Sequence, residues 1–183
     1  MARYAVLLLA LLLLAAYWLG REPPPKPRQA VGAAELYGVR FRLYPEADPD
    51  AEWVFEAGRV DYDPGRRESR VVGLSRGERW VKGELDLKLR AEEVRIDRYD
   101  NLTMPRAEVE IPKECWRVEL IGSHATPVRV DQRRGFFAPR FRLEGPGVRV
   151  EGEGFRSDFG LEDASWHSGR EEWRTGEEND CNP

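Results

Sequence analysis

Apolar residues recur at every second position through most of this chain after Val39. Charged side chains, mainly Arg and Glu, occupy nearly all the positions between them. Such alternation is typical of a β-strand with one face on a core and the other in water. No stretch after residue 30 has the 3.6-residue period of an amphipathic helix. The pattern predicts a single antiparallel all-β domain with strands at Val39–Leu43, Leu85–Leu89, Val94–Ile96, Val109–Ile111, Trp116–Leu120, Val128–Val130, Phe141–Leu143 and Val148–Val150.

A seven-residue pattern that opens on a small residue and ends on Asp recurs along these runs. The copies are Ala57–Asp63, Ala91–Asp97 and Ala125–Asp131, 34 residues apart, and more loosely Gly152–Asp158. The spacing favours one repeated hairpin unit, and chance recurrence in an Ala-, Val- and Arg-rich chain is the alternative. The apolar positions change from odd at Leu89 to even at Val94. Both halves can face one core only if the strand bends or bulges near Glu92-Glu93.

The first twenty residues contain one charged side chain, Arg3, and a long apolar run. Tyr4–Leu19 would form about 24 Å of helix, with aromatic residues at both ends as at membrane interfaces. Bulky residues stand where a signal peptidase needs small ones, so we expect residues 1–20 to be an uncleaved anchor; a cleaved signal peptide is the alternative. Four prolines in residues 21–30 predict a stiff linker. Residues 31–169 would then be the β-domain, and residues 170–183 an acidic flexible tail.

Composition excludes several classes of function. The net charge is −4 and the chain has no basic stripe, so we expect no nucleic-acid partner. Two His and two Cys, without ligand spacing, give no basis for a metal site. No nucleophile and base are paired in a recognisable motif, so we expect no enzymatic activity and no cofactor.

The anchor, the Pro-rich linker and the repeated β-domain together resemble the LptC family. This is the membrane-anchored periplasmic component of the lipopolysaccharide export system, with an LptA/OstA-like β-jellyroll. The segments that carry the resemblance are Trp53–Tyr62, Leu89–Asp97, Phe137–Gly145 and Val148–Phe155. It implies an open β-jellyroll, a two-sheet antiparallel sandwich of repeated hairpin units, on a single-pass inner-membrane helix, with the domain in the periplasm. It also implies three partners: lipopolysaccharide or a related glycolipid, an inner-membrane ABC transporter that supplies it, and a periplasmic OstA-like bridge protein that receives it.

The acyl chains of such a lipid would lie in an apolar trough between the two sheets, without catalysis. Our candidates for its lining are Phe41, Leu43, Leu85, Leu87, Leu89, Val94, Ile96, Val109, Ile111, Trp116, Val118, Val128, Val130, Phe141, Leu143, Val148 and Val150. For each of these residues the alternative is ordinary core packing, which the sequence does not distinguish from lipid contact. For the whole protein the alternative is an anchored structural scaffold of the cell envelope without lipid cargo.

The two cysteines, Cys115 and Cys181, are a candidate disulfide. An exported compartment would be oxidising enough for the bond to form. It would attach the acidic tail to a strand of the domain. Two free thiols are the alternative.

Overall fold

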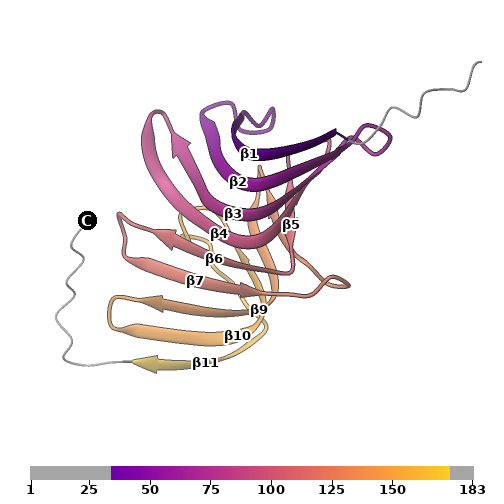
Figure 1. The fold of residues 1–183 in the computed structure, drawn as a ribbon. Helices are drawn as coiled ribbons and strands as arrows, with labels where there is room; N and C mark the ends of the chain where they lie inside the picture. The colour runs from indigo at the N-terminus through magenta and orange to yellow at the C-terminus, as the bar shows by residue number, and fades with distance from the viewer. Residues whose placement is uncertain (1–33, 174–183) are drawn as a thin grey trace, which may run out of the picture. The chain divides into compact units, whose positions relative to one another are not determined.

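A computed structural model describes residues 34–173, which form eleven β-strands and no helix (Figure 1). Every strand pairing within this range is antiparallel, which confirms the predicted all-β antiparallel domain. The strands are β1 (Ala34–Leu43), β2 (Ala51–Asp63), β3 (Glu68–Val81), β4 (Glu84–Ile96), β5 (Leu102–Met104), β6 (Arg106–Ile111), β7 (Trp116–Ile121), β8 (Val128–Asp131), β9 (Gly135–Gly145), β10 (Val148–Ser157) and β11 (Ser168–Trp173).

The sheet folds over on itself because its long strands each take part in two layers. The first half of β4 pairs with β6 through Lys88–Arg90, whereas its last residues, Arg95 and Ile96, pair with β5. In the same way β9 pairs with β8 at its start and with β7 at its end. We call the layer that contains β6 and β7 the front layer, and the layer that contains β5 and β8 the back layer (Figure 1). The long strands pass from one layer to the other at a corner.

The corner is where the inward-facing positions of each long strand change phase. Buried residues of β4 switch from odd at Leu89 to even at Val94, which confirms the predicted change of phase. The accompanying register shift lies on the neighbouring strand, between Leu74 and Glu78 of β3. In β10 the change falls at Gly154, whose φ of 69° is the left-handed conformation that glycine tolerates best. One extra residue per strand thus keeps both halves of the strand facing one interior.

The aspartate that ends each sequence repeat stabilises the turn that follows a back-layer strand. Asp97 Oδ1 accepts hydrogen bonds from the backbone N–H groups of Tyr99 and Asn101, at 2.8 and 3.0 Å. Asp63 and Asp131 each accept two backbone N–H groups in the same way, and Asp158 accepts one. Asp is favoured here because its short carboxylate can reach the N–H groups two and more residues ahead. The repeat therefore encodes a strand that enters the back layer and stops.

The hydrophobic core is one continuous cluster between the two layers. Its largest fully buried side chains are Trp53, Phe55, Phe136 and Phe155. They come from β2, β9 and β10, strands that cross the corner. Burying such aromatic residues contributes much of the stability of a domain of this size.

The structure moves the predicted end of the β-domain, which we placed at residue 169. Other predicted segments lie outside the described residues. Residues 170–173, which we assigned to the acidic tail, belong to β11 and pair with β10, with Val150 opposite Glu171. Backbone pairing does not require an apolar side chain, so the alternation rule missed this strand. The predicted anchor (1–20), the linker (21–30) and residues 174–183 lie outside the described residues. Between residues 34 and 173 there is no helix long and apolar enough to span a membrane.

Candidate functional site

The candidate trough residues all belong to strands that enclose the interior. Of these the structure buries Leu87, Leu89, Val94, Ile96, Val109, Ile111, Val118, Val128, Val130, Phe141, Leu143 and Val150. It leaves the remaining ones partly exposed: Phe41, Leu43, Leu85, Trp116 and Val148. The buried residues belong to one apolar interior, and Phe41, Leu43, Trp116 and Val148 pack against its margin, whereas Leu85 is not part of this cluster. Contact with a lipid stays a prediction.

Apolar inward-facing side chains of the edge strand β1 are exposed to solvent. Residues directly opposite each other in an antiparallel pair project to the same face, so Leu36, which pairs with the buried Val60, faces inward. Its side chain is nonetheless 52% exposed. Phe41 also faces inward, 5.2 Å from the ring of its partner Phe55, and is only partly buried. Apolar inward-facing side chains thus continue to an edge strand that nothing covers in the described part of the chain.

Aromatic residues also gather at the opposite end, near β11. Phe141 and Phe155 stack with their ring centroids 4.6 Å apart, and Trp166 lies 5.6 Å from Phe141. Trp173 pairs with Val148, which makes it inward-facing, yet it is 72% exposed. The apolar surface therefore reaches both edge strands, β1 and β11.

Two buried polar side chains that we did not predict, those of Gln132 and Arg79, lie on the side away from the corner. Trp53 Nε1 donates a 3.0 Å hydrogen bond to Oε1 of Gln132, whose Nε2 donates to the backbone oxygen of Asp100 at 2.7 Å. This chain of hydrogen bonds joins the front layer to the turns of the back layer. Arg79 of β3 is the one buried charged residue in the described range; it is only 6% exposed.

Arg79 faces the interior because its cross-strand partners, Trp53 and Leu87, do so. Its guanidinium is ion-paired with Asp48 and Asp86 and lies 3.9 Å from the centroid of the Phe159 ring. A buried guanidinium requires such partners, because desolvating an unpaired charge is costly. Most strands of this sequence carry Arg at outward positions, and no pattern in the sequence distinguishes Arg79, which faces inward.

Several apolar interior residues were also absent from our candidates. Trp53, Phe55 and Ala57 alternate with polar or less buried residues in β2, and Leu102 and Met104 do so in β5. Their spacing was the available signal, but Val54 interrupts the first run and the second is only three residues long. Further buried side chains that we missed are Val60, Val71, Leu74, Leu120, Phe136 and Phe155.

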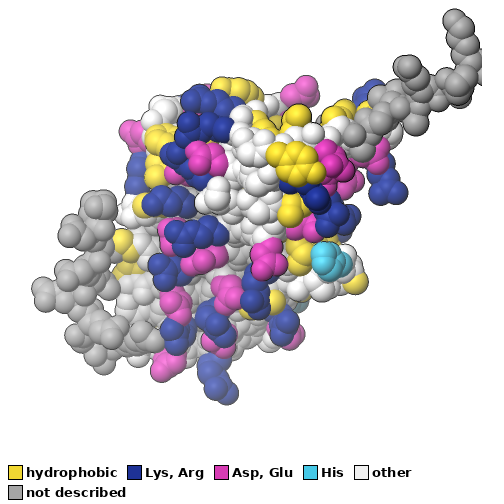
Figure 2. Space-filling model, viewed as in Figure 1, with side chains coloured by type: hydrophobic (Ala, Val, Ile, Leu, Met, Phe, Trp, Pro, Cys, Tyr) yellow, Lys and Arg dark blue, Asp and Glu magenta, His cyan; other side chains and the backbone are white. Residues whose placement is uncertain are grey.

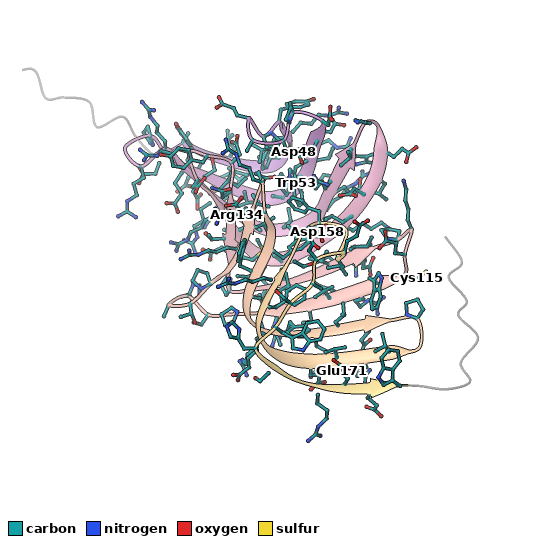
Figure 3. All side chains as sticks on the ribbon, turned by 180° about the vertical axis from the view of Figure 1, so that it is seen from behind. Asp48, Trp53, Cys115, Arg134, Asp158 and Glu171 are labelled. Carbon is teal, nitrogen blue, oxygen red and sulfur yellow. The ribbon has the colours of Figure 1, made fainter. Side chains whose placement is uncertain are left out.

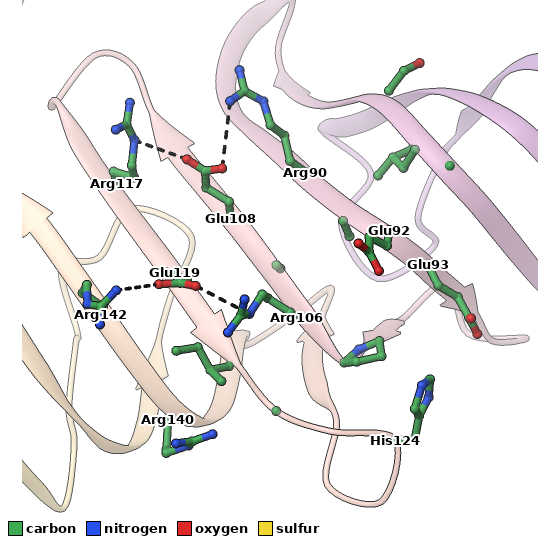
Figure 4. A pocket seen from close by; sticks show the side chains of 18 of the residues that line it. Arg90, Glu92, Glu93, Arg106, Glu108, Arg117, Glu119, His124, Arg140 and Arg142 are labelled. Atoms are coloured by element: carbon green, nitrogen blue, oxygen red, sulfur yellow. Dashed lines mark hydrogen bonds and ion pairs between the residues drawn. The ribbon is translucent and has the colours of Figure 1, made fainter.

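The outer surface carries charges of both signs in alternating rows (Figure 2). A depression of about 1070 Å³ lies over β3, β4, β6, β7 and β9, and most of the Arg and Glu residues that line it are ion-paired (Figure 4). Glu119, for example, lies 3.1 Å from Arg142 and 3.5 Å from Arg106. Because the charges are balanced, this depression presents no field of one sign that would attract a nucleic acid or another polyanion. We interpret it as a solvated ion-pair surface.

On the back layer a single ion pair shifts the titration of a carboxyl group. Arg70 donates a 2.7 Å hydrogen bond to Glu93. This bond, with smaller contributions from the charge of Arg70 and from Arg95, lowers the pKa of Glu93 below its ordinary value against an opposing effect of burial.

Cys115 lies in the turn between β6 and β7 and forms a disulfide bond. Its backbone has a φ of 59°, an uncommon conformation for a residue other than glycine. Cys181, the only other cysteine of the chain, lies outside the described residues. The pairing of Cys115 with Cys181 therefore stays a prediction.

The apolar interior, whose inward-facing residues on β1 are exposed, is the feature of the described residues best suited to hold a ligand. The sequence matches no protein-family model and no curated protein.

Proposed function

We propose that this protein is a non-catalytic lipid-transfer protein with an open β-jellyroll domain. It accepts lipopolysaccharide or a related glycolipid from an inner-membrane ABC transporter and passes it through its apolar interior to a periplasmic OstA-like bridge protein. The N-terminal apolar segment anchors it in the inner membrane, so that the β-domain works in the periplasm.

The observation that carries the proposal is the exposure of inward-facing apolar residues along β1. A closed sandwich would bury these positions, because exposed apolar area on an inner face costs free energy. Here Leu36 is 52% exposed, and Phe41 and Leu43 are partly exposed. An acyl chain placed against them would remove apolar surface from water and continue into the core cluster.

The two edge strands support a place in a chain of proteins. Among residues 34–173, β1 and β11 each pair on one side only, and they stand at opposite ends of the strand order. An unpaired edge can accept a strand of a neighbouring protein, and then the interiors of the two proteins become continuous. One edge would face the transporter and the other the bridge protein.

The complete burial of the central core residues favours the alternative, an envelope scaffold without cargo. Leu87, Leu89 and Val109 have no exposed area and contact only other parts of the protein. For lipid to reach them the two layers would have to move apart. The scaffold requires no such movement.

The two functions differ in bound lipid, which mass spectrometry can detect. The full chain would be expressed in its own host, purified from membranes in mild detergent and extracted with organic solvent. Phe41→Glu would place a carboxylate on the exposed inward face. Tyr44→Glu, which makes the same kind of change at a 62% exposed position just after β1, is the matched control.

We expect an acylated glycolipid in stoichiometric amount with the wild type and with Tyr44→Glu, and much less with Phe41→Glu. Circular dichroism would show that all three proteins are folded. A folded wild-type protein without glycolipid, or equal amounts in all three, would overturn the proposal and favour the scaffold.

A further inference from the structure

We infer that the side of the domain opposite the corner is a port for an acyl chain, closed by the loop of residues 158–164. Phe159 of this loop occupies the position that the hydrocarbon would take. This inference rests on the proposed function, because it assumes a lipid cargo. It adds a route of entry from the side, distinct from the edge strands.

Phe159 is placed between the two layers. Its ring lies 6.4 Å from that of Trp53 in the front layer and 5.3 Å from that of Phe136 in the back layer, edge-on in both cases. Its other neighbour is the guanidinium of Arg79. Figure 3 shows Trp53 and Asp158, the residue before Phe159, on this side of the molecule. The side chain thus closes the gap between layers although it is not part of either.

The loop is the part of this wall that can move most easily. Residues 158–163 belong to no strand. The hydrogen bonds at the loop run from the Asp163 N–H and the Ser157 hydroxyl to Asp158, and between the backbones of Arg156 and Ser165. Leu161 has a φ of 60°, which is strained for a residue with a branched side chain. Weakly held segments of this kind open at lower free-energy cost than strands do.

The chemistry of the opening suits an amphiphile. Behind Phe159 lies the apolar core, and Arg79 stands at the rim with Asp48 and Asp86. Withdrawal of the ring would uncover an apolar channel with a charged margin. A hydrocarbon chain could then replace the ring while the polar head of the lipid stays at the margin in water. Trp53 and Gln132 would hold the layers together beside the opening.

Photo-crosslinking of the full chain in its native membranes tests this inference. Phe159 would be replaced by p-benzoylphenylalanine, whose benzophenone reacts with nearby C–H bonds under ultraviolet light. Position 41 would be labelled in a second protein to report on the interior at β1, and position 44, which is exposed, in a third as the control. Lipid adducts would be identified by mass spectrometry after proteolysis.

We expect adducts at positions 159 and 41 and none at position 44. Phe159→Ala should raise the labelling rate at position 41 several-fold, because the port is then open. Adducts at position 41 without adducts at 159, or labelling at position 41 that does not change with Phe159→Ala, would overturn the port and leave the proposed function intact. Absence of adducts at both positions would count against the lipid-transfer function itself.

Discussion

Trp53 of β2 and Gln132, in the turn after β8, are 79 residues apart in sequence and share a buried hydrogen bond of 3.0 Å. The bond crosses from the front layer to the back layer on the side away from the corner. Gln132 also donates to the backbone of Asp100, so its amide satisfies two buried polar groups. A single side chain thus fixes the separation of the two layers at this point.

Gln132→Met should therefore destabilise the domain. Methionine has a similar size, but it leaves the Trp53 N–H and the Asp100 carbonyl without their partner, at a cost of about 1–3 kcal/mol. Chemical denaturation followed by tryptophan fluorescence measures the change in the free energy of unfolding. Arg129→Met, at an exposed position of β8, serves as the control and should change stability by less than about 0.5 kcal/mol. Equal stability of the two variants would show that the bond contributes nothing.

Gly38 and Gly154 differ in the space around their Cα atoms, and this difference predicts different effects of an alanine substitution. Gly38 and Gly154 both have left-handed φ angles, of 59° and 69°. A Cβ at Gly38 would meet nothing within 4 Å, whereas one at Gly154 would overlap the imidazole of His167. Gly38→Ala should cost only the conformational strain, about 1–2 kcal/mol. Gly154→Ala should lower the midpoint of thermal unfolding clearly further, and similar midpoints would contradict the steric argument.

Asp97 accepts backbone hydrogen bonds as the aspartates of the other repeats do, which predicts that it stabilises its turn. Its carboxylate accepts the N–H groups of Tyr99 and Asn101 and also the Asn101 side-chain amide. Asp97→Ala should destabilise the domain by about 1–2 kcal/mol, because these donors lose a partner. Asp97→Asn keeps an oxygen at the same place and should retain most of the stability. Urea denaturation of both variants would detect the difference; an alanine variant as stable as the asparagine variant would contradict it.

The alternation of apolar residues was sufficient to predict the fold class and part of the buried core. It worked because one face of each strand is buried and the other is charged, as at Leu87, Lys88 and Leu89. The change of phase at Leu89 and Val94 was also visible, since the repeat placed it in the sequence. These features are local, and local patterns are what a single sequence records.

The features that were missed depend on distant contacts. Arg79 is buried only because Asp48, Asp86 and Phe159 come together around it. β11 forms because the backbone of β10 is available, although its own residues are all exposed. Neither arrangement leaves a period or motif in the sequence. The sequence therefore predicted apolar lining residues of the candidate site, but not Arg79 and Phe159, which close it on one side.

Leu87 is completely buried, so we expect a charge at this position to destabilise the fold whether or not a ligand binds. Leu87 has no exposed area and projects into the interior beside Arg79. Leu87→Glu would remove a core side chain and bury a carboxylate, and we expect a loss of more than about 4 kcal/mol. Lys88→Glu, on the outer face of the same strand, should unfold close to the wild type. Circular dichroism during thermal unfolding compares them, and a cooperative, wild-type-like transition for Leu87→Glu would show that this part of the interior admits water.

The ion pair of Arg70 and Glu93 predicts a pH dependence with a definite sign. The hydrogen bond from Arg70 lowers the pKa of Glu93 in the folded state below its ordinary value of 4.5. A carboxyl group with a lowered pKa stabilises the fold fully above its unfolded-state value, and this contribution disappears as the pH falls through the folded-state value. Wild-type protein should therefore lose more stability than Glu93→Gln between about pH 6 and about pH 3.

Glu92→Gln is the matched control for this experiment, because it removes the same charge from the exposed neighbouring position. Its decline in stability with falling pH should follow that of the wild type. Urea denaturation midpoints at each pH give the comparison, and high salt should reduce the difference since both charges of the pair are partly exposed. If Glu93→Gln and Glu92→Gln lose stability in parallel, the ion pair with Arg70 does not contribute to folding.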